Sequence, residues 1–156
     1  MIVIKRTHDM DLVRHVLTNE KIYHHMADDG SPKRRDFRPV DSPNMYYLIP
    51  YYDGGSAPLG SLLFHPINTI LYQVHICVLP TYWGKNTVNI ANLALDWMKK
   101  NTPCRRVMTI TPASNKLAQR LAKKCGLIQE GYLKDGVLRG GKFEDLVILG
   151  RLLECK

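Results

Sequence analysis

The chain has 156 residues, 45% of them hydrophobic, and its 22 Lys and Arg against 14 Asp and Glu give a formal net charge of +8. This length predicts one domain over residues 1–156 with a substantial core, because no repeat or linker divides the sequence. No run approaches the roughly 18 apolar residues of a membrane-spanning helix, so we expect a cytoplasmic protein.

The charge and the cysteines restrict the partners. An excess of basic residues favours an anion nearby, and nucleic acid or the ribosome is one candidate, although basic pairs at helix ends also have a structural reason. Cys77, Cys104, Cys125 and Cys155 lack metal-ligand or redox spacing, so we expect reduced thiols. No metal site is expected.

The first third of the chain combines short ordered segments with a long loop. Residues 2–5 alternate as in a strand, and residues 9–26 carry apolar side chains at helical spacing, with Asp9 as the expected N-cap. Residues 28–44 are polar and interrupted by glycine and proline, which predicts a loop long enough to belong to a binding surface.

The middle of the chain is predicted to be mostly strand. Residues 45–51 and 59–64 are expected to pair as a hairpin, and residues 70–79 to form the next strand. A helix with an apolar stripe starts near Val88 and ends at residues 101–103.

The last third alternates strand and helix. We expect a strand over residues 106–111 and a helix over residues 116–125, closed by Gly126 in a left-handed cap. Two strands, over residues 127–133 and 143–152, finish a mixed α/β (α+β) fold with an antiparallel first half.

Two segments carry the functional signal. The run Val78-Leu79-Pro80-Thr81-Tyr82-Trp83-Gly84-Lys85-Asn86 leads from an apolar strand through a glycine-containing turn into a helix. The N–H groups at a helix start lack intrahelical partners and carry partial positive charge, so such a turn can bind a pyrophosphate through its backbone. A second block begins at Asn115 and ends in Gly126-Leu127 and Glu130-Gly131.

Together these blocks resemble the GNAT acetyltransferases, in which a strand ends in Val-x-Pro and is followed by (Gln/Arg)-x-x-Gly-x-(Gly/Ala). Val78 and Pro80 match the strand end, and Gly84 supplies a glycine in the loop. Trp83 stands where Gln or Arg is usual, and Asn86 and Val88 replace residues that are usually Gly or small. The Glu-Gly ending looks most like the branch that includes the ribosomal-protein N-terminal acetyltransferases. The resemblance implies a central mixed, twisted sheet of six or seven strands, with helices on both faces and a splay at the end of the fourth strand.

The resemblance also implies acetyl-CoA as the co-substrate. It assigns the acyl arm to the backbone at Val78 and Leu79, and a further contact to Asn115, which can also cap the following helix. The pyrophosphate is assigned to the segment Trp83, Gly84, Lys85, Asn86, Thr87 and Val88. A hydrophobic anchor over the helix is an equal interpretation of Trp83.

A general base is often found in this family on the strand before the phosphate loop, here at Gln73 or His75. Alternation places both on one face of the strand. Gln cannot take a proton at neutral pH, so His75 is the candidate base; the alternative is a half-buried structural histidine. The position of the family's general-acid tyrosine is Ala122.

By the same resemblance, the acceptor groove is expected near His24, His25, Tyr46 and Tyr47, for which ordinary surface and core filling is the alternative. A single weak base suits an α-amine, with a pKa of about 7.7 to 8.0, better than lysine at about 10.4. We therefore expect N-acetylation of a protein N-terminus or small amine, by a monomer or homodimer. The alternative is a GNAT-like binding or structural module with impaired catalysis.

Overall fold

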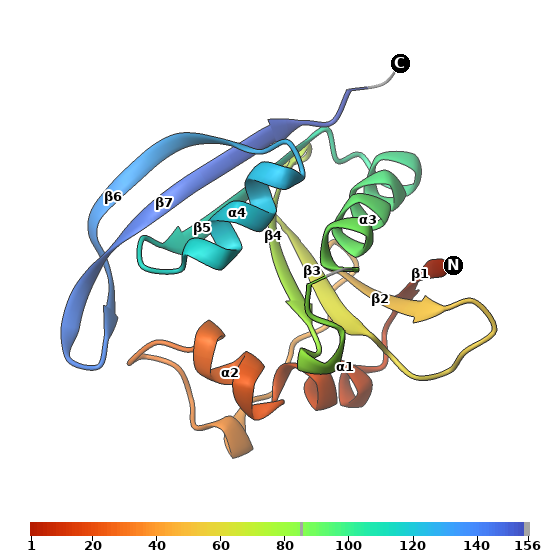
Figure 1. Cartoon of the computed structure of the whole chain (residues 1–156), viewed down its shortest axis with the longest axis horizontal. Helices are drawn as coiled ribbons and strands as arrows, with labels where there is room; N and C mark the ends of the chain where they lie inside the picture. Colours follow the sequence, from red (N-terminus) through yellow and green to blue (C-terminus); the bar gives the residue numbers. More distant parts are fainter. Residues whose placement is uncertain (85, 155–156) are drawn as a thin grey trace.

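A computed structural model describes residues 1–84 and 86–154 and shows one seven-stranded sheet in the order β1-β2-β3-β4-β5-β7-β6 (Figure 1). The mixed α/β architecture expected from the sequence is confirmed. The elements are β1 (Ile2–Thr7), α1 (Met10–Leu17), α2 (Glu20–Met26), η1 (Arg34–Asp36), β2 (Tyr46–Tyr52), β3 (Gly60–Pro66), β4 (Leu71–Val78), η2 (Pro80–Tyr82), α3 (Thr87–Asn101), β5 (Arg106–Pro112), α4 (Lys116–Lys124), β6 (Ile128–Arg139) and β7 (Lys142–Leu152).

The sheet opens in its middle, between β4 and β5. This is the parallel pair, and its pairing runs only from Leu71 opposite Arg106 to Gln73 opposite Met108, whereas β3 accompanies β4 as far as Val78. Beyond Gln73 the two strands diverge, and Figure 1 shows them spreading apart below α4. The splay expected where the fourth strand ends is confirmed.

Helices cover both faces of the sheet, because alternate strand residues supply two separate cores. Leu48, Phe64 and Val74 face the larger core together with α3 and α4. Tyr47, one residue before Leu48, faces the smaller core under α1 and α2. β4 is therefore covered on both sides over most of its length.

The helical pattern predicted over residues 9–26 is two helices instead of one. Asp9 caps α1, since its carboxylate accepts from the N–H groups of Asp11 and Leu12 at 3.1 Å. Asn19 then starts α2 by accepting from the N–H of Lys21 at 3.1 Å. A side chain that offers the backbone a cap in mid-segment ends one helix and begins another, although the apolar spacing continues.

The last hairpin is longer than predicted. β6 was expected to stop at residue 133 but continues to Arg139, where Gly140 and Gly141 turn the chain with φ values of 59° and 73°. The irregular register between Leu133 and Val137 explains why the alternating pattern fades there. The predicted N-cap at Asn115 and the left-handed Gly126, with a φ of 84°, are both confirmed.

Arginines order the loop between α2 and β2. Arg14 donates to the backbone carbonyls of Arg35 and Phe37 at 2.8 and 2.9 Å, and Arg34 donates to that of Thr18 at 3.0 Å. Some of the basic residues that give the chain its net positive charge therefore stabilise the chain itself.

Asp29 clamps this loop to the distant β6–β7 hairpin. Its carboxylate accepts from the N–H groups of Gly140 and Gly141 at 2.7 and 2.8 Å, and its own N–H donates to the carbonyl of Leu138 at 3.0 Å. Figure 1 shows the loop after α2 reaching the tip of the hairpin. Among the described residues, no helix has the length and apolarity required to cross a membrane.

Candidate active site

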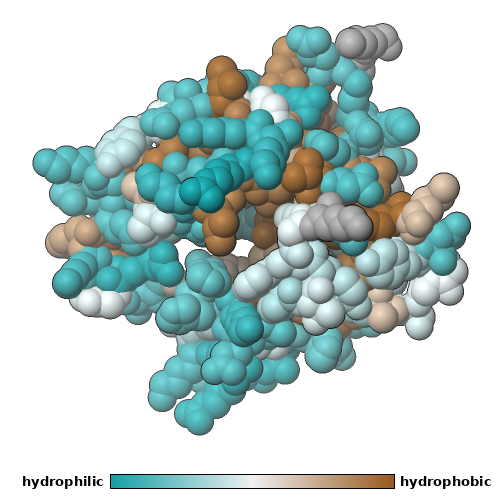
Figure 2. All heavy atoms as spheres, viewed as in Figure 1, coloured by the Kyte–Doolittle hydropathy of each residue, from teal (hydrophilic) through white to brown (hydrophobic). Residues whose placement is uncertain are grey.

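A cleft of about 810 Å³ fills the gap between the diverging strands. Its walls come from α2 and the residues just after it, β4, the start of α3, the end of β5, α4 and the β6–β7 hairpin. Figure 2 shows the corresponding hollow at the centre of the molecule, with hydrophobic residues visible at its edge. The opening in the sheet is thus a solvent-accessible site and is not filled by side chains.

The wall contributed by β4 is an open strand edge. On the far side of this strand, the N–H of Leu79 donates to the carbonyl of Leu59 at 2.9 Å, in register with β3. Because backbone groups alternate in direction along an antiparallel strand, Val78 points its N–H and C=O away from β3 and into the gap left by β5. This edge can accept an extended ligand that contains amide groups.

Trp83 occupies one of these edge groups. Its indole N–H donates to the carbonyl of Val78 at 2.6 Å, while half of the residue surface stays exposed. Trp83 lies at the position where the sequence motif usually has Arg or Gln, and here it folds back on the strand end. It is both an anchor of the turn and a neighbour of the site.

The turn after Trp83 leads directly into the N-terminus of α3. Gly84 has a φ of 95°, a conformation that residues with a Cβ adopt only at a cost. The N-cap residue, Asn86, makes no capping hydrogen bond with its side chain. Thr87 and Val88, in the first turn of this helix, line the cleft, and the N–H groups that a helix start leaves without intrahelical partners are suited to an anion. Lys85 lies outside the described residues.

The charge of the cleft complements an anion. Four cationic residues are among its lining, Lys21, Arg120, Lys124 and Arg139, and within the described part of the chain Asp28 is the one carboxylate there. Thr109, on the diverging part of β5, also lines the cleft, and its hydroxyl oxygen is buried without a hydrogen-bond partner among the described residues. A polar ligand would find both charge and an unpaired hydroxyl.

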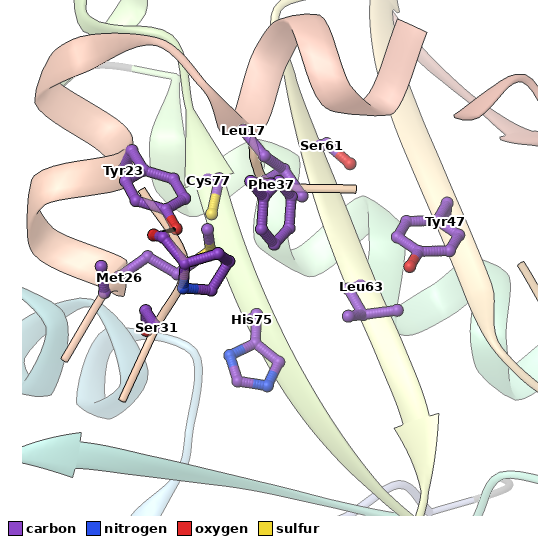
Figure 3. A pocket seen from close by; sticks show the side chains of 12 residues that line it. Leu17, Tyr23, Met26, Ser31, Phe37, Tyr47, Ser61, Leu63, His75 and Cys77 are labelled. Carbon is purple, nitrogen blue, oxygen red and sulfur yellow. Dashed lines mark hydrogen bonds between the residues drawn. The ribbon is translucent and has the colours of Figure 1, made fainter. Parts of the chain in front are cut away.

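A second cavity, of about 220 Å³, lies on the opposite face of β4, under α1, α2 and the loop that follows them. We call it the inner pocket. Figure 3 shows Tyr23 and Met26 on one side of it, and His75 and Leu63 on neighbouring strands on the other. Met26, Ala27, His75 and Cys77 line both cavities. The cleft and the inner pocket are therefore adjacent at the last residues of β4 and the end of α2, a place that we call the junction.

His75 is held neutral at this junction. Burial, followed by the nearby ring of His65, lowers its pKa from 6.5 to about 4. The two rings stack with centroids 5.5 Å apart. Burial also raises the pKa of the Cys77 thiol to about 12, so Cys77 is no nucleophile at neutral pH. Near neutral pH, His75 can accept a hydrogen bond but cannot retain a proton.

Most of the residues predicted for the site do reach it. The cleft is lined by Gln73, His75, Val78, Trp83, Gly84, Thr87, Val88, Asn115 and His25, and the inner pocket by His75 and Tyr47. Cofactor and base candidates far apart in the sequence thus lie around one cavity.

Four predicted residues lie elsewhere. Tyr46 packs against Tyr72 and Trp97 on the α3 side, because neighbouring strand residues face opposite ways and Tyr46 cannot share the groove of Tyr47. Leu79 packs into the core under α1, and the Asn86 amide donates to the Tyr52 hydroxyl at 3.2 Å.

His24, the fourth of these residues, is exposed at the end of α2 and lines neither cavity, unlike its neighbour His25. Adjacent residues on a helix point about 100° apart, so one of the two faces solvent. Within residues 1–84 and 86–154, no cluster of His, Cys, Asp and Glu has the arrangement of metal ligands.

Several site residues were missed by sequence reasoning. Thr109 and Arg139 come from strands that carry no motif, and Met26 and Ala27 end a helix whose periodicity indicated only a buried face. Ala122, at the expected general-acid position, forms part of the cleft wall, while Tyr132 donates to Asp145 and lines neither cavity. No local pattern distinguishes these positions.

Comparison with known families gives the identity of this arrangement. The family model described as acetyltransferase (GNAT) family matches residues 12–127, most of the chain. The chain belongs to the GNAT acetyltransferase family. As such it is an acyltransferase dependent on acetyl-CoA, as expected from the sequence. No curated protein sequence matches this acetyltransferase significantly.

Solved structures share the fold of this acetyltransferase at low sequence identity. The spermidine N-acetyltransferase from Vibrio cholerae in complex with CoA and spermine superposes with a TM-score of 0.79 at 16% identity, over 97% of this chain and 95% of that one. A GNAT-family acetyltransferase from Streptococcus pneumoniae gives a TM-score of 0.73 at 18% identity, over 97% and 99%. The predicted GNAT fold is confirmed.

The residues of the cleft fit acetyl-CoA. The free edge of β4 suits the two amides of an extended pantetheine arm, and the uncapped start of α3 and the cationic rim suit its phosphates. The unpaired Thr109 hydroxyl leaves one further polar group for the ligand. Trp83, Asn86 and Val88 differ from the usual motif, yet Gly84 has a positive φ and the start of α3 has no side-chain cap.

Proposed function

We propose that this acetyltransferase transfers an acetyl group to a primary amine that approaches β4 from the inner pocket. The observation that carries the proposal is the junction of the two cavities at Met26, Ala27, His75 and Cys77. A donor lying along the open edge of β4 and an acceptor in the inner pocket would meet there, without either having to enter the other's space.

The acyl donor supplies an activated thioester. Along β4, the N–H of Val78 points into the gap and can stabilise the oxyanion that forms at the acyl carbon, whereas the N–H of Leu79 is already bonded to Leu59. Val78, and not Leu79, would therefore stabilise the reaction centre through its backbone N–H. The indole N–H of Trp83 is bonded to the Val78 carbonyl and would have to release it before an amide N–H of the donor could donate to the same oxygen.

His75 would position the amine and not deprotonate it fully. With a pKa of about 4, the ring accepts a hydrogen bond from a neutral amine but binds a proton too weakly to remove one from an ammonium ion. The proton lost on transfer passes to water in the open cleft. Because Ala122 replaces the usual acid, water also supplies the proton to the departing thiolate.

These roles favour an acceptor with a low pKa. At pH 7.5, about a third of α-amines but only about one lysine in a thousand are neutral. A protein N-terminus or a small amine therefore fits best. The neighbouring enzyme of Vibrio cholerae is described with spermine, which makes polyamines a candidate as well. The ribosomal-protein branch, and contact with the ribosome or nucleic acid, stay predictions without further support.

The test is a thiol-release assay with acetyl-CoA and amines of graded pKa, together with calorimetric titration of acetyl-CoA. We expect micromolar binding and amine-dependent CoA release. A His75→Gln variant should bind acetyl-CoA as before, and its kcat should fall by at most about tenfold. Binding of acetyl-CoA without transfer to any amine would contradict the proposal and favour a non-catalytic module.

A further inference from the structure

The inner pocket is apolar on nearly all sides. Leu17, Tyr23, Met26, Phe37 and Leu63 form much of its wall (Figure 3). None of the residues that line it within the described part of the chain is a carboxylate or a permanent cation. The pocket thus offers hydrophobic surface next to His75, beside the proposed reaction centre.

The tyrosines of the wall add ring surface and no free hydroxyl. The Tyr23 hydroxyl donates to the carbonyl of Pro32, and the Tyr47 hydroxyl donates to that of Val40 at 2.8 Å. Burial raises the pKa of both phenols, so neither provides a negative charge near neutral pH. The polar groups left in the wall are few, chiefly His75 and the buried hydroxyl of Ser61, which has no hydrogen-bond partner in residues 1–84 and 86–154.

The charges of the adjoining cleft oppose a polycation. Among its described lining residues, Asp28 alone carries a carboxylate, against Lys21, Arg120, Lys124 and Arg139. A polyamine has several ammonium groups and would have to leave water for a site that offers one compensating charge. Such desolvation without pairing is unfavourable, even though related folds are described with spermine.

Resting on the proposed function, we infer that the acceptor is a monoamine whose amine-bearing carbon or its neighbour carries an apolar group, such as a phenyl or a branched aliphatic side chain. The amine would lie at the junction beside His75, and the apolar group would enter the inner pocket toward Tyr23 and Phe37. An apolar cavity of roughly 150 Å³ already binds benzene, so about 220 Å³ is sufficient for this group.

The experiment compares amines matched in everything but the side chain. Phenylalaninamide and glycinamide are both α-amino amides, and spermidine represents the polyamines. Burial of a Phe-sized group gives about 1.5 to 3 kcal/mol, so we expect kcat/KM about 10- to 150-fold higher for phenylalaninamide than for glycinamide. Peptides starting with Phe or Gly distinguish a protein N-terminus from a free small amine as the source of the same chemistry.

A variant that fills the junction tests the location. Ala27 lines both cavities, and Ala27→Phe should remove the preference for phenylalaninamide while acetyl-CoA still binds. Ala57→Phe, in the exposed turn between β2 and β3, is the matched control and should keep the preference. If Ala27→Phe does not fold, Met26→Ala enlarges the junction and should raise kcat/KM for larger apolar groups.

The outcomes separate this inference from the proposed function. Preferred acetylation of spermidine, or equal rates with phenylalaninamide and glycinamide, would overturn the apolar acceptor but leave acetyl transfer intact. If no amine is acetylated, the proposed function fails, and calorimetric titration of phenylalaninamide decides the inference by itself. Binding lost in Ala27→Phe and kept in Ala57→Phe would support the pocket, and absence of binding would refute it.

Discussion

The two cavities that adjoin at β4 differ in the groups that they present to a ligand. The cleft offers a ligand mainly backbone groups: the free edge of Val78, the turn at Gly84 and the N-terminus of α3. The inner pocket is made of side chains such as Phe37 and Leu63. A site made of backbone groups depends little on which side chains are present, whereas the ligand of a site made of side chains can change with a substitution. We therefore expect the donor to be shared across the fold and the acceptor to be particular to this chain.

The largest effect is expected at Gly60, which supports the strand that both cavities share. A Cβ at this position would collide with the carbonyl oxygen of Cys77 and lie 2.9 Å from the Cα of Val78. Gly60→Ala should reduce the free energy of unfolding by about 2 to 4 kcal/mol, because rigid backbone must move. It should also weaken both acetyl-CoA and acceptor binding, measured by denaturant unfolding and calorimetry.

The control for this prediction is Gly55→Ala, in an exposed turn, where the nearest atom is the Tyr52 carbonyl oxygen at 3.1 Å. Comparable losses in the two variants would show that β4 is not held as tightly as the structure indicates.

The second prediction concerns pH and distinguishes the side-chain cavity from the backbone one. The pKa of His75 is about 4 in the folded protein and 6.5 in the unfolded chain. Between pH 4 and 6.5 the unfolded chain therefore binds a proton at His75 that the folded protein does not bind. Stability from this group is complete above pH 6.5 and falls by about 3 kcal/mol as the pH is lowered toward 4.

Urea unfolding between pH 6.5 and 4.5 measures this slope. His75→Gln should flatten it, whereas His24→Gln, at an exposed site, should not. In activity, the pH profile should follow the pKa of the acceptor amine and show no inflection near 6.5 that belongs to His75. An inflection there that disappears in His75→Gln would refute a neutral His75.

The third prediction isolates the backbone of the cleft. Gly84 and Gly54 have φ values of 95° and 77°, and a Cβ at either would meet no atom within 4 Å. Replacement by Ala should cost each about 1 to 2 kcal/mol of stability through strain alone. Only Gly84→Ala should weaken the binding of acetyl-CoA, with a Kd about tenfold higher, because only the turn at Gly84 leads into α3. Equal affinity in the two variants would exclude the turn from the binding site.

The smallest effect is expected at Trp83. Trp83→Phe removes the N–H that occupies the Val78 carbonyl, so acetyl-CoA should bind about 2- to 10-fold more tightly, the equivalent of one hydrogen bond. Acetyl-CoA should also change the tryptophan fluorescence, and this signal should vanish in Trp83→Phe but persist in Trp97→Phe. Weaker binding by Trp83→Phe would mean that the indole supports the ligand and does not compete with it.

The backbone part of the site was largely accessible from the sequence, because its signals are local. A glycine that needs a positive φ, a capping Asn115 and a Val-x-Pro strand end can all be identified within a few residues. The splay followed from the family resemblance that these motifs carry. Tyr46 shows where a local rule was neglected: alternation alone excludes it from the face of Tyr47.

The side-chain part could not be predicted, since its members are scattered from Leu17 to Cys77 and meet only through tertiary packing. Nothing in the local sequence indicates that the Tyr23 and Tyr47 hydroxyls are taken up by backbone carbonyls, or that Trp83 turns back to Val78. The acidity of His75 likewise depends on burial and on a histidine of the neighbouring strand.

The clamp at Asp29 has a mechanical consequence. The sheet is divided where β4 and β5 diverge, and its two halves, β1–β4 and β5–β7, could move apart about the short paired segment. Asp29 restrains this motion at the open side, because it connects the loop after α2 to Gly140 and Gly141 of the β6–β7 hairpin. The two halves of the sheet are thereby connected on both sides of the cleft. We expect the width of the cleft to be set before acetyl-CoA binds, so that little binding free energy is spent on closing the cleft.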